Sequence, residues 1–242
     1  MSLLYFQNSI FKLAAYLIIL FNSHNLLGQM SPEVLYQSAI SSQSHLSNGS
    51  SFKPSYASRT EHPFFLDPQF TKASITYDRV LYKDVKLLYN LATEELLLKD
   101  SISGKIIRLI GENISSFSIH NHSFLKFNSN PDLEDGFYDL LHDGTCRVLI
   151  RRDKSLQYIK RDGRIKNIYQ ARDRIFLIVN GQVFPVTTKS SILEGFGTNA
   201  IGVKNGIKNV EVKFSSDKEN YCVAAAKIFD QLMSRWGYVF YL

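Results

Sequence analysis

The stretch at residues 175–186 reads IFLIVNGQVFPV, and the stretch at residues 137–150 reads FYDLLHDGTCRVLI. Each contains two apolar runs on either side of a turn pair, Asn180-Gly181 in the first stretch and Asp143-Gly144 in the second. Such pairs supply the positive φ angles that two-residue hairpin turns require. Both stretches therefore predict antiparallel β-hairpins.

Short β-rich runs separated by turn residues continue this pattern from Ala73 to Val186, with a further tight hairpin expected at Asp78-Arg79. No helical pattern intervenes, and parallel strands would need long crossovers, so the pairing should be antiparallel. We expect about nine to eleven strands, arranged as a sandwich or a partly closed barrel. The expected strands cover residues 75–77, 80–82, 85–91, 96–98, 106–110, 116–119, 124–127, 137–142, 146–150, 175–179 and 183–186.

After Val186 the apolar period becomes helical. Residues 188–196 predict a short helix, followed by a stretch interrupted by several glycines. A longer helix is expected at about Asp217–Arg235, with a capping box in which Ser216 is the N-cap and Glu219 reaches back to it. The fold class is therefore predicted to be α+β, mainly antiparallel β with helices at the C-terminus.

Composition excludes several classes of protein. The chain has 242 residues, 45% of them hydrophobic, which is enough for a substantial core. Two cysteines are too few for a disulfide scaffold, and 6 prolines and 13 glycines are too few for a fibrous or disordered chain. The net charge of +6 is a mild excess, so we expect no nucleic-acid partner.

The first 28 residues predict a secretory signal peptide. Lys12, their only charge, precedes the apolar run Leu13–Phe21, which is about half of the roughly 20 residues that a bilayer crossing needs. An uncleaved membrane anchor is the alternative. The protein is thus expected to be exported, periplasmic or extracellular, with no transmembrane segment after cleavage. We expect a Ser-rich, extended or mobile lead segment at 29–61, a β body at 62–187 and a helical segment packed on the sheet at 188–242.

The order of features resembles a group of exported bacterial envelope proteins to which no activity is assigned. Four stretches carry the resemblance: His62–Phe65, Ile75–Asp78, Gly136–Tyr138 and Asn180–Val186. Apolar positions between 82 and 91 continue it, whereas Arg79 and Asn90 depart from the pattern, where Gly and Asp are expected. The resemblance implies an exported β-rich protein, and it implies no activity and no site residues.

The strongest candidate site is a basic stretch. Residues 147–174 contain ten Lys or Arg and only three Asp. On the strand expected there, Arg147 and Arg151 should share one face, opposite Cys146 and Val148. A basic sheet face would attract lipid headgroups, envelope polysaccharide or an acidic partner, whereas the alternative is a solvated face whose charges prevent aggregation. The candidate anion-binding residues are Arg147, Arg151, Arg152, Lys154, Arg161 and Arg164.

Two other residue pairs could carry chemistry or a cross-link. His120 and His122 are two residues apart, as metal ligands on one strand face would be. A third ligand is needed, which His62, His142 or an acidic loop residue could supply only through folding, and a polar turn is the alternative. Cys146 and Cys222 could form a disulfide in an oxidising compartment, or they could be two separate buried thiols.

Two functions follow as hypotheses. The first is a non-enzymatic binding or accessory protein of the cell envelope, without a cofactor, whose partner is an envelope component or another exported protein. The second is a hydrolase of envelope polymers with a site assembled from scattered acidic and His residues. No Gly-x-Ser-x-Gly nucleophile elbow occurs in the sequence, which favours the first. Two carboxylates or a His–carboxylate pair converging in the deepest cleft would favour the second.

Overall fold

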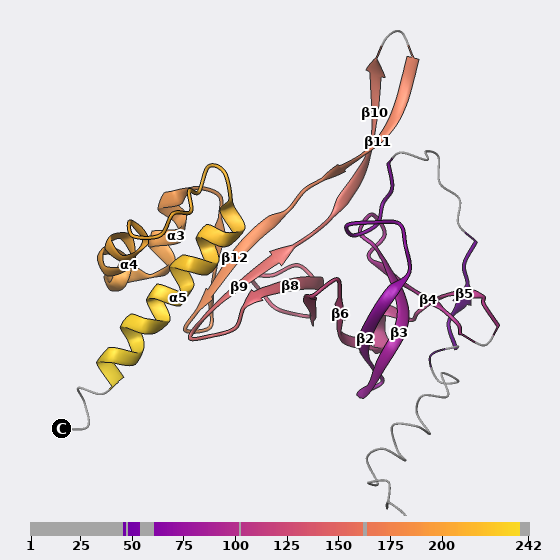
Figure 1. The fold of residues 1–242 in the computed structure, drawn as a ribbon, viewed down its shortest axis with the longest axis horizontal. Coiled ribbons are helices and arrows are strands. Elements are labelled where there is room, and N and C mark those ends of the chain that lie inside the picture. Colours follow the sequence, from indigo (N-terminus) through magenta and orange to yellow (C-terminus); the bar gives the residue numbers. More distant parts are fainter. Residues whose placement is uncertain (1–45, 47, 54–60, 102, 162–163, 238–242) are drawn as a thin grey trace, which may run out of the picture. The chain divides into compact units, whose positions relative to one another are not determined.

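Every strand pairing among the described residues of the computed structural model is antiparallel. The structure describes residues 46, 48–53, 61–101, 103–161 and 164–237, all within the unit that spans residues 43–242. Eleven of the described strands form one large sheet, and two form a separate hairpin (Figure 1). The large sheet contains β1 (Ser50–Ser51), β2 (Thr71–Tyr77), β3 (Val80–Asn90), β4 (Glu95–Lys99), β5 (Ile106–Arg108), β6 (Ile114–Ile119), β7 (His122–Phe127), β8 (Gly136–His142), β9 (Cys146–Arg151), β12 (Arg174–Val179) and β13 (Gln182–Val186).

The large sheet is open. Its strand order is β1-β5-β4-β3-β2-β6-β7-β8-β9-β12-β13, so two meanders meet where β2 pairs with β6, and β1 and β13 are the edges. The α+β, mainly antiparallel prediction is confirmed, and the described residues contain thirteen strands. The additional ones are β1 and the hairpin of β10 (Lys154–Arg161) and β11 (Arg164–Ala171), while the two runs expected at 80–82 and 85–91 form the single strand β3.

Two of the three expected tight turns have the predicted backbone. Asp78 and Arg79 have φ angles of 49° and 65°, and Asn180 and Gly181 have 51° and 79°. The third hairpin forms, but its turn differs from the prediction: residues 143–145 connect β8 to β9, and Gly144 is absent from the described positive-φ residues. A Cβ at Gly144 would instead collide with the carboxylate of Asp230, so close approach requires glycine there.

Three helices follow the strands: α3 (Lys189–Gly195), α4 (Ala200–Ile207) and α5 (Lys218–Gly237). The short helix predicted at 188–196 is confirmed as α3, and Thr188 caps it. The predicted capping of α5 is wrong by one residue, because Asp217 Oδ1 accepts from the backbone N–H of Asn220 while Glu219 turns to another partner. The short 3₁₀ helices are η3 (Gly111–Asn113) and η4 (Gly197–Asn199).

Helix α4 lies in the stretch that the sequence presents as glycine-interrupted. Its glycines allow close packing against α5: a Cβ at Gly202 would lie 2.9 Å from a methyl carbon of Leu232, and one at Gly206 would lie 2.8 Å from Ile228. Glycine in a helix is less favourable than alanine by about 1 kcal/mol, so the local sequence pattern does not predict this helix. Tertiary contact with α5 stabilises it instead.

The helices cover the β9–β12 part of the sheet, and their contact forms one core, which we call the helix–sheet core (Figure 1). Alternation on the strands decides which side chains enter it, since successive side chains point to opposite faces. Val148 and Leu177 project from the strands, while Phe196 and Phe229 stack at 5.0 Å on the helical side. A second, aromatic core lies where the two meanders meet: Phe117 of β6 lies against Tyr89 of β3, Phe124 of β7 and Phe137 of β8, with ring centroids 4.7–5.2 Å apart.

The predicted signal peptide at residues 1–28 lies outside the described residues, as does most of the lead segment. Part of the lead segment joins the sheet, because Ser50 and Ser51 pair with Arg108 and Ile107 of β5. Within the described ranges, none of the helices combines the length and the apolar character needed to cross a membrane.

Candidate functional site

The basic stretch 147–174 runs from β9 through the β10–β11 hairpin into β12, and the structure divides its cations into two groups. We call β10 and β11 together the arm. Arg151, Arg152 and Lys154 lie at the base of the arm, where acidic side chains and carbonyl oxygens engage them. Lys160 and Lys166 lie further out along the arm, where their side chains are exposed. The two groups therefore have different roles.

Arg152 is the centre of a buried ionic cluster. Its Nε donates to Asp139 Oδ2 at 2.8 Å, its Nη1 donates to Asp173 at 3.0 Å, and it forms two parallel bonds of 2.9 Å with the Glu219 carboxylate. Asp139 is 0% exposed, and His122 Nδ1 lies 2.7 Å from the same Oδ2. Burial alone would lower the pKa of Arg152, but the hydrogen bonds with Glu219 and Asp139 outweigh it and raise that pKa. Arg152 therefore stays charged and holds β8 and α5 together.

Arg151 is engaged in the same way on its own side of the strand. Its Nη2 lies 2.7 Å from Glu94 Oε1, and its Nη1 donates to the Asp135 carbonyl at 2.9 Å. Gly136, with φ of 142°, leaves room for the guanidinium, because a Cβ there would collide with it. Burial raises the pKa of Glu94 in spite of this partner. Arg147 and Arg151 lie at positions of the same parity on β9, but Arg147 is exposed whereas Arg151 is buried, so the two do not form one exposed basic face.

Lys154 and the backbone of β11 attach the arm to residues 61–65. The ammonium of Lys154 donates to the carbonyls of His62 and Phe64, at 3.1 and 2.6 Å. The backbone N–H of Tyr169 donates to Glu61 Oε2 at 2.9 Å. Burial lowers the pKa of Lys154. Lys154 therefore attaches the base of the arm to residues 62–64, and the exposed cations of the arm lie further out.

The outer arm is an amphipathic two-stranded ribbon. Residues opposite each other in antiparallel strands share a face, and the register pairs Leu156 with Tyr169, Tyr158 with Asn167 and Lys160 with Ile165. On this face, Leu156 is 36%, Tyr158 70% and Ile165 75% exposed. Isolated hairpins are marginally stable in water, so an uncovered apolar face of this kind is costly unless a partner covers it.

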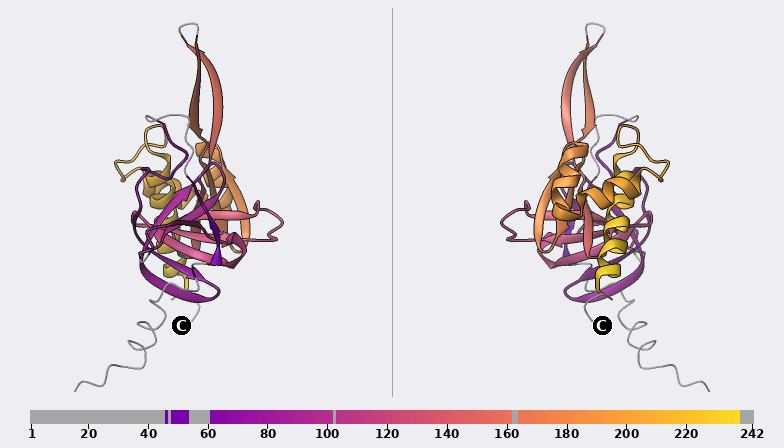
Figure 2. Two further views of the ribbon diagram at one scale, coloured as in Figure 1. Left: turned by 90° about the vertical axis from the view of Figure 1, so that its right-hand side faces the viewer. Right: turned by 90° about the vertical axis from the view of Figure 1, so that its left-hand side faces the viewer.

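Neither arm strand pairs with the large sheet, and the arm stands away from it in the views of Figures 1 and 2. Arg161 and Arg164 end its two strands and pair with each other in the register. The sequence contains a signal for this hairpin that the charge pattern obscures: Asp162-Gly163 between two alternating runs. Anion binding by the six residues predicted from the basic stretch stays a prediction, and only part of that set is available at the surface.

His120 and His122 have different positions and different partners at the turn between β6 and β7. His120 lies in the turn with φ of 50°, and its Nε2 is 3.8 Å from Asp67 Oδ2, while His122 in β7 contacts Asp139. Both rings pack on Phe65, with centroids 6.3 and 5.0 Å away. No group of three or more metal-ligating side chains is found among the residues that the structure describes.

Cys146 and Cys222 are both buried free thiols, and both belong to the helix–sheet core. Burial raises the pKa of each thiol to about 12. A thiol with such a pKa is protonated at neutral pH and is a poor nucleophile. As free thiols, Cys146 and Cys222 therefore serve as packing residues of the core.

A second His–carboxylate pair joins the β8–β9 turn to α5. His142 Nε2 lies 2.7 Å from Asp230 Oδ2, and Asp230 Oδ1 accepts from the backbone N–H of Cys146 at 3.0 Å. The partners are 88 residues apart in the chain, so no local pattern announces the pair. Like Asp139 and Glu219, Asp230 is a residue that sequence reasoning missed.

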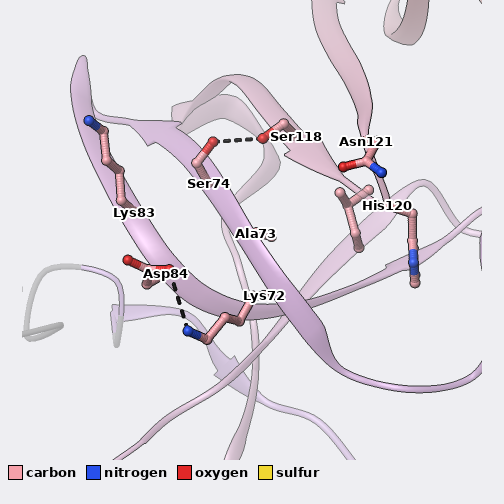
Figure 3. A pocket seen from close by; sticks show the side chains of 9 residues that line it. Lys72, Ala73, Ser74, Lys83, Asp84, Ser118, His120 and Asn121 are labelled. Carbon is pink, nitrogen blue, oxygen red and sulfur yellow. Dashed lines mark hydrogen bonds and ion pairs between the residues drawn. The ribbon is translucent and has the colours of Figure 1, made fainter.

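Two cavities of the described residues bear on the hydrolase hypothesis, which requires convergent acid–base groups. The first has a volume of about 310 Å³ and lies between β2, β3 and the turn after β6 (Figure 3). Four of its polar side chains are paired with each other, Ser74 with Ser118 at 2.7 Å and Lys72 with Asp84 at 3.8 Å. The second, of about 550 Å³, lies in the helical layer and is lined by lysines and apolar residues. Neither of these cavities is lined by His122–Asp139 or His142–Asp230, so their geometry does not favour the hydrolase hypothesis.

No protein-family model matches the chain, and no curated protein and no solved structure matches it either.

Proposed function

We propose that this chain is an exported, non-enzymatic binding or accessory protein of the cell envelope, which contacts an anionic lipid surface through its arm. The observation that supports the proposal best is the exposed face that Leu156, Tyr158 and Ile165 form on the arm. It lies next to Lys160 and Lys166, two exposed lysines that have no ion-pair partner among the described residues. The expected signal peptide and the resemblance to exported proteins support the location.

Charge and apolar exposure together favour lipid over other anionic partners. Tyr and aliphatic side chains insert at the level of lipid headgroups, and nearby Lys or Arg side chains are attracted to anionic lipids, each contributing about 1 kcal/mol near the surface. Lys160 shares the exposed face with Ile165, and Lys166 lies on the opposite face of the ribbon. A soluble polyanion would use the cations and leave Tyr158 and Ile165 uncovered.

The test is a vesicle-binding titration with the full-length protein at low and high salt. We expect binding to vesicles that contain anionic phospholipid, little binding to zwitterionic vesicles, and weakening as salt rises, because exposed charges are screened beyond about 8–10 Å. Lys160→Ser/Lys166→Ser and Tyr158→Ser/Ile165→Ser should each weaken binding. The matched control is Lys99→Ser/Lys105→Ser, which removes two exposed lysines near the β4–β5 connection.

Three results would contradict the proposal. One is an absence of binding to anionic vesicles at low salt. Another is equal binding by wild type and both arm variants. The third is loss of binding in the lysine variant alone together with tighter binding to an acidic polysaccharide, which would identify a polyanion as the partner. Hydrolysis of an envelope polymer that depends on His122 or His142 would support the hydrolase hypothesis instead.

A further inference from the structure

The cavity of the helical layer has a volume of about 550 Å³ and lies between α4, the connecting segment 208–217 and the start of α5. This volume is within the range of small-molecule sites, about 300–1,000 Å³. We call it the lysine groove.

The wall of the groove is apolar. Ile207 and Tyr221 are buried within the helix–sheet core, and Val210, Val212 and Phe214 pack against that core while remaining half-buried. Phe214 meets Tyr221 edge to face, with ring centroids 5.6 Å apart. Apolar surface left open at such a position is stabilised when a ligand removes it from water.

The rim of the groove carries one sign of charge. Lys189, Lys204, Lys208 and Lys213 line it, and no acidic residue does. Among the described residues these lysines form no ion pair; Lys208 donates to the Asn205 side chain at 3.2 Å. Lys189 Nζ lies 5.5 Å from the centre of the Tyr221 ring, so this ammonium stands directly above the apolar wall.

Lysines grouped around an apolar wall repel each other, and an anion among them would relieve that repulsion. A simple anion would leave the wall uncovered, and a neutral lipid would leave the lysines uncompensated. We propose that the groove binds a single-chain amphiphile with an anionic head, its chain on the Val210–Phe214 segment and its head among the rim lysines. This site is separate from the arm and does not depend on the function proposed for it.

The experiment is calorimetric titration of the full-length protein with fatty-acid anions below their micelle concentrations. Laurate should bind saturably with one site per chain. Each additional pair of CH₂ groups buried, from octanoate to decanoate to laurate, should tighten binding about tenfold. Acetate tests the head alone, and dodecanol tests the chain alone; both should bind at least about tenfold more weakly than laurate.

Variants locate the site. Lys204→Ser/Lys213→Ser should weaken laurate binding at least about tenfold, and Val212→Trp should weaken it by filling the groove. Lys99→Ser/Lys105→Ser is the matched lysine control, and Tyr158→Ser/Ile165→Ser in the arm should leave laurate binding unchanged. Because all the lysine changes are at exposed positions, folding should persist, and thermal unfolding of each variant verifies this.

The proposal is overturned if laurate does not bind, if Lys204→Ser/Lys213→Ser binds it as wild type does, or if acetate or dodecanol binds as tightly as laurate. Whether or not laurate binds to the groove does not depend on whether the arm binds vesicles. Failure of one site is thus distinguishable from failure of the other.

Discussion

Arg152 and Glu219 form a two-bond ion pair between the end of β9 and the first turn of α5, with both N···O distances at 2.9 Å. The residues are 67 positions apart in the chain. Paired guanidinium–carboxylate hydrogen bonds of this kind are strong, and they also fix the relative orientation of the two side chains. The same guanidinium neutralises Asp139, so one side chain ties the arm's base, the sheet and the helical layer together.

Replacing Arg152 by Met should destabilise the fold by about 3–5 kcal/mol, because Asp139 would remain buried without a compensating charge. Chemical denaturation measures this change in the free energy of unfolding. The matched control is Arg147→Met, whose partner Asp143 is exposed, and it should cost at most about 1 kcal/mol. Similar losses in the two variants would show that the cluster around Arg152 contributes no more than a surface pair.

The β2–β3 turn offers a stabilising change. Arg79 has φ of 65°, a left-handed conformation that favours glycine, and its side chain is exposed. Arg79→Gly should raise the free energy of unfolding by about 1 kcal/mol, because it relieves the Cβ strain of this conformation. Arg79→Ala separates the backbone effect from loss of the side chain and should bring no such gain. A lower melting temperature for the glycine variant than for wild type would contradict the strain argument.

Most of the elements that the sequence predicts correctly are specified by short local patterns. Asn180-Gly181 is an example, because the turn dipeptide and the apolar runs on either side of it are sufficient to predict the β12–β13 hairpin. The arm was missed although Asp162-Gly163 marks it, because charged residues interrupt the alternation that predicts strands. Helix α4 was missed because its glycines serve contact with α5, which no local pattern reveals.

The ionic cluster could not be predicted for a related reason. Sequence shows that residues 147–174 are basic, but it does not show that Asp139 and Glu219 fold back onto Arg152. Burial of an arginine depends on partners from distant strands and helices. The same dependence hides the lysine groove, whose rim combines Lys189 with Lys213 across two intervening helical segments.

Gly144 provides a test of close approach. Gly144→Ala should destabilise the protein by about 1–3 kcal/mol, because the new methyl group would displace the Asp230 carboxylate and with it the bond to His142. Gly111→Ala is the control: a Cβ there meets nothing within 4 Å, and its change should stay within about 0.5 kcal/mol. If Gly144→Ala is as stable as Gly111→Ala, the packing between the β8–β9 turn and α5 is looser than the structure indicates.

The buried thiols predict a specific loss of stability at alkaline pH. Burial raises the pKa of Cys146 and of Cys222 from 9.0 to about 12. A pKa that is higher in the folded state means that the folded chain retains protons that the unfolded chain loses. The resulting stabilisation is complete below pH 9 and declines as the pH rises from about 9 toward 12, by up to about 1.4 kcal/mol per pH unit for each thiol.

The comparison that isolates this effect is wild type against Cys146→Ala/Cys222→Ala, both unfolded with urea in reductant at several pH values between 8 and 11. Other titrating groups are common to the two chains, so their contributions cancel in the difference. The stability advantage of wild type should be constant near pH 8 and should shrink above pH 9, because only wild type has thiols to ionise on unfolding. Thiol counting without reductant should give two free thiols after denaturation and almost none before it. An advantage that does not change with pH, or a count of zero in the denatured chain, would show that these sulfurs are not the buried, protonated thiols described above.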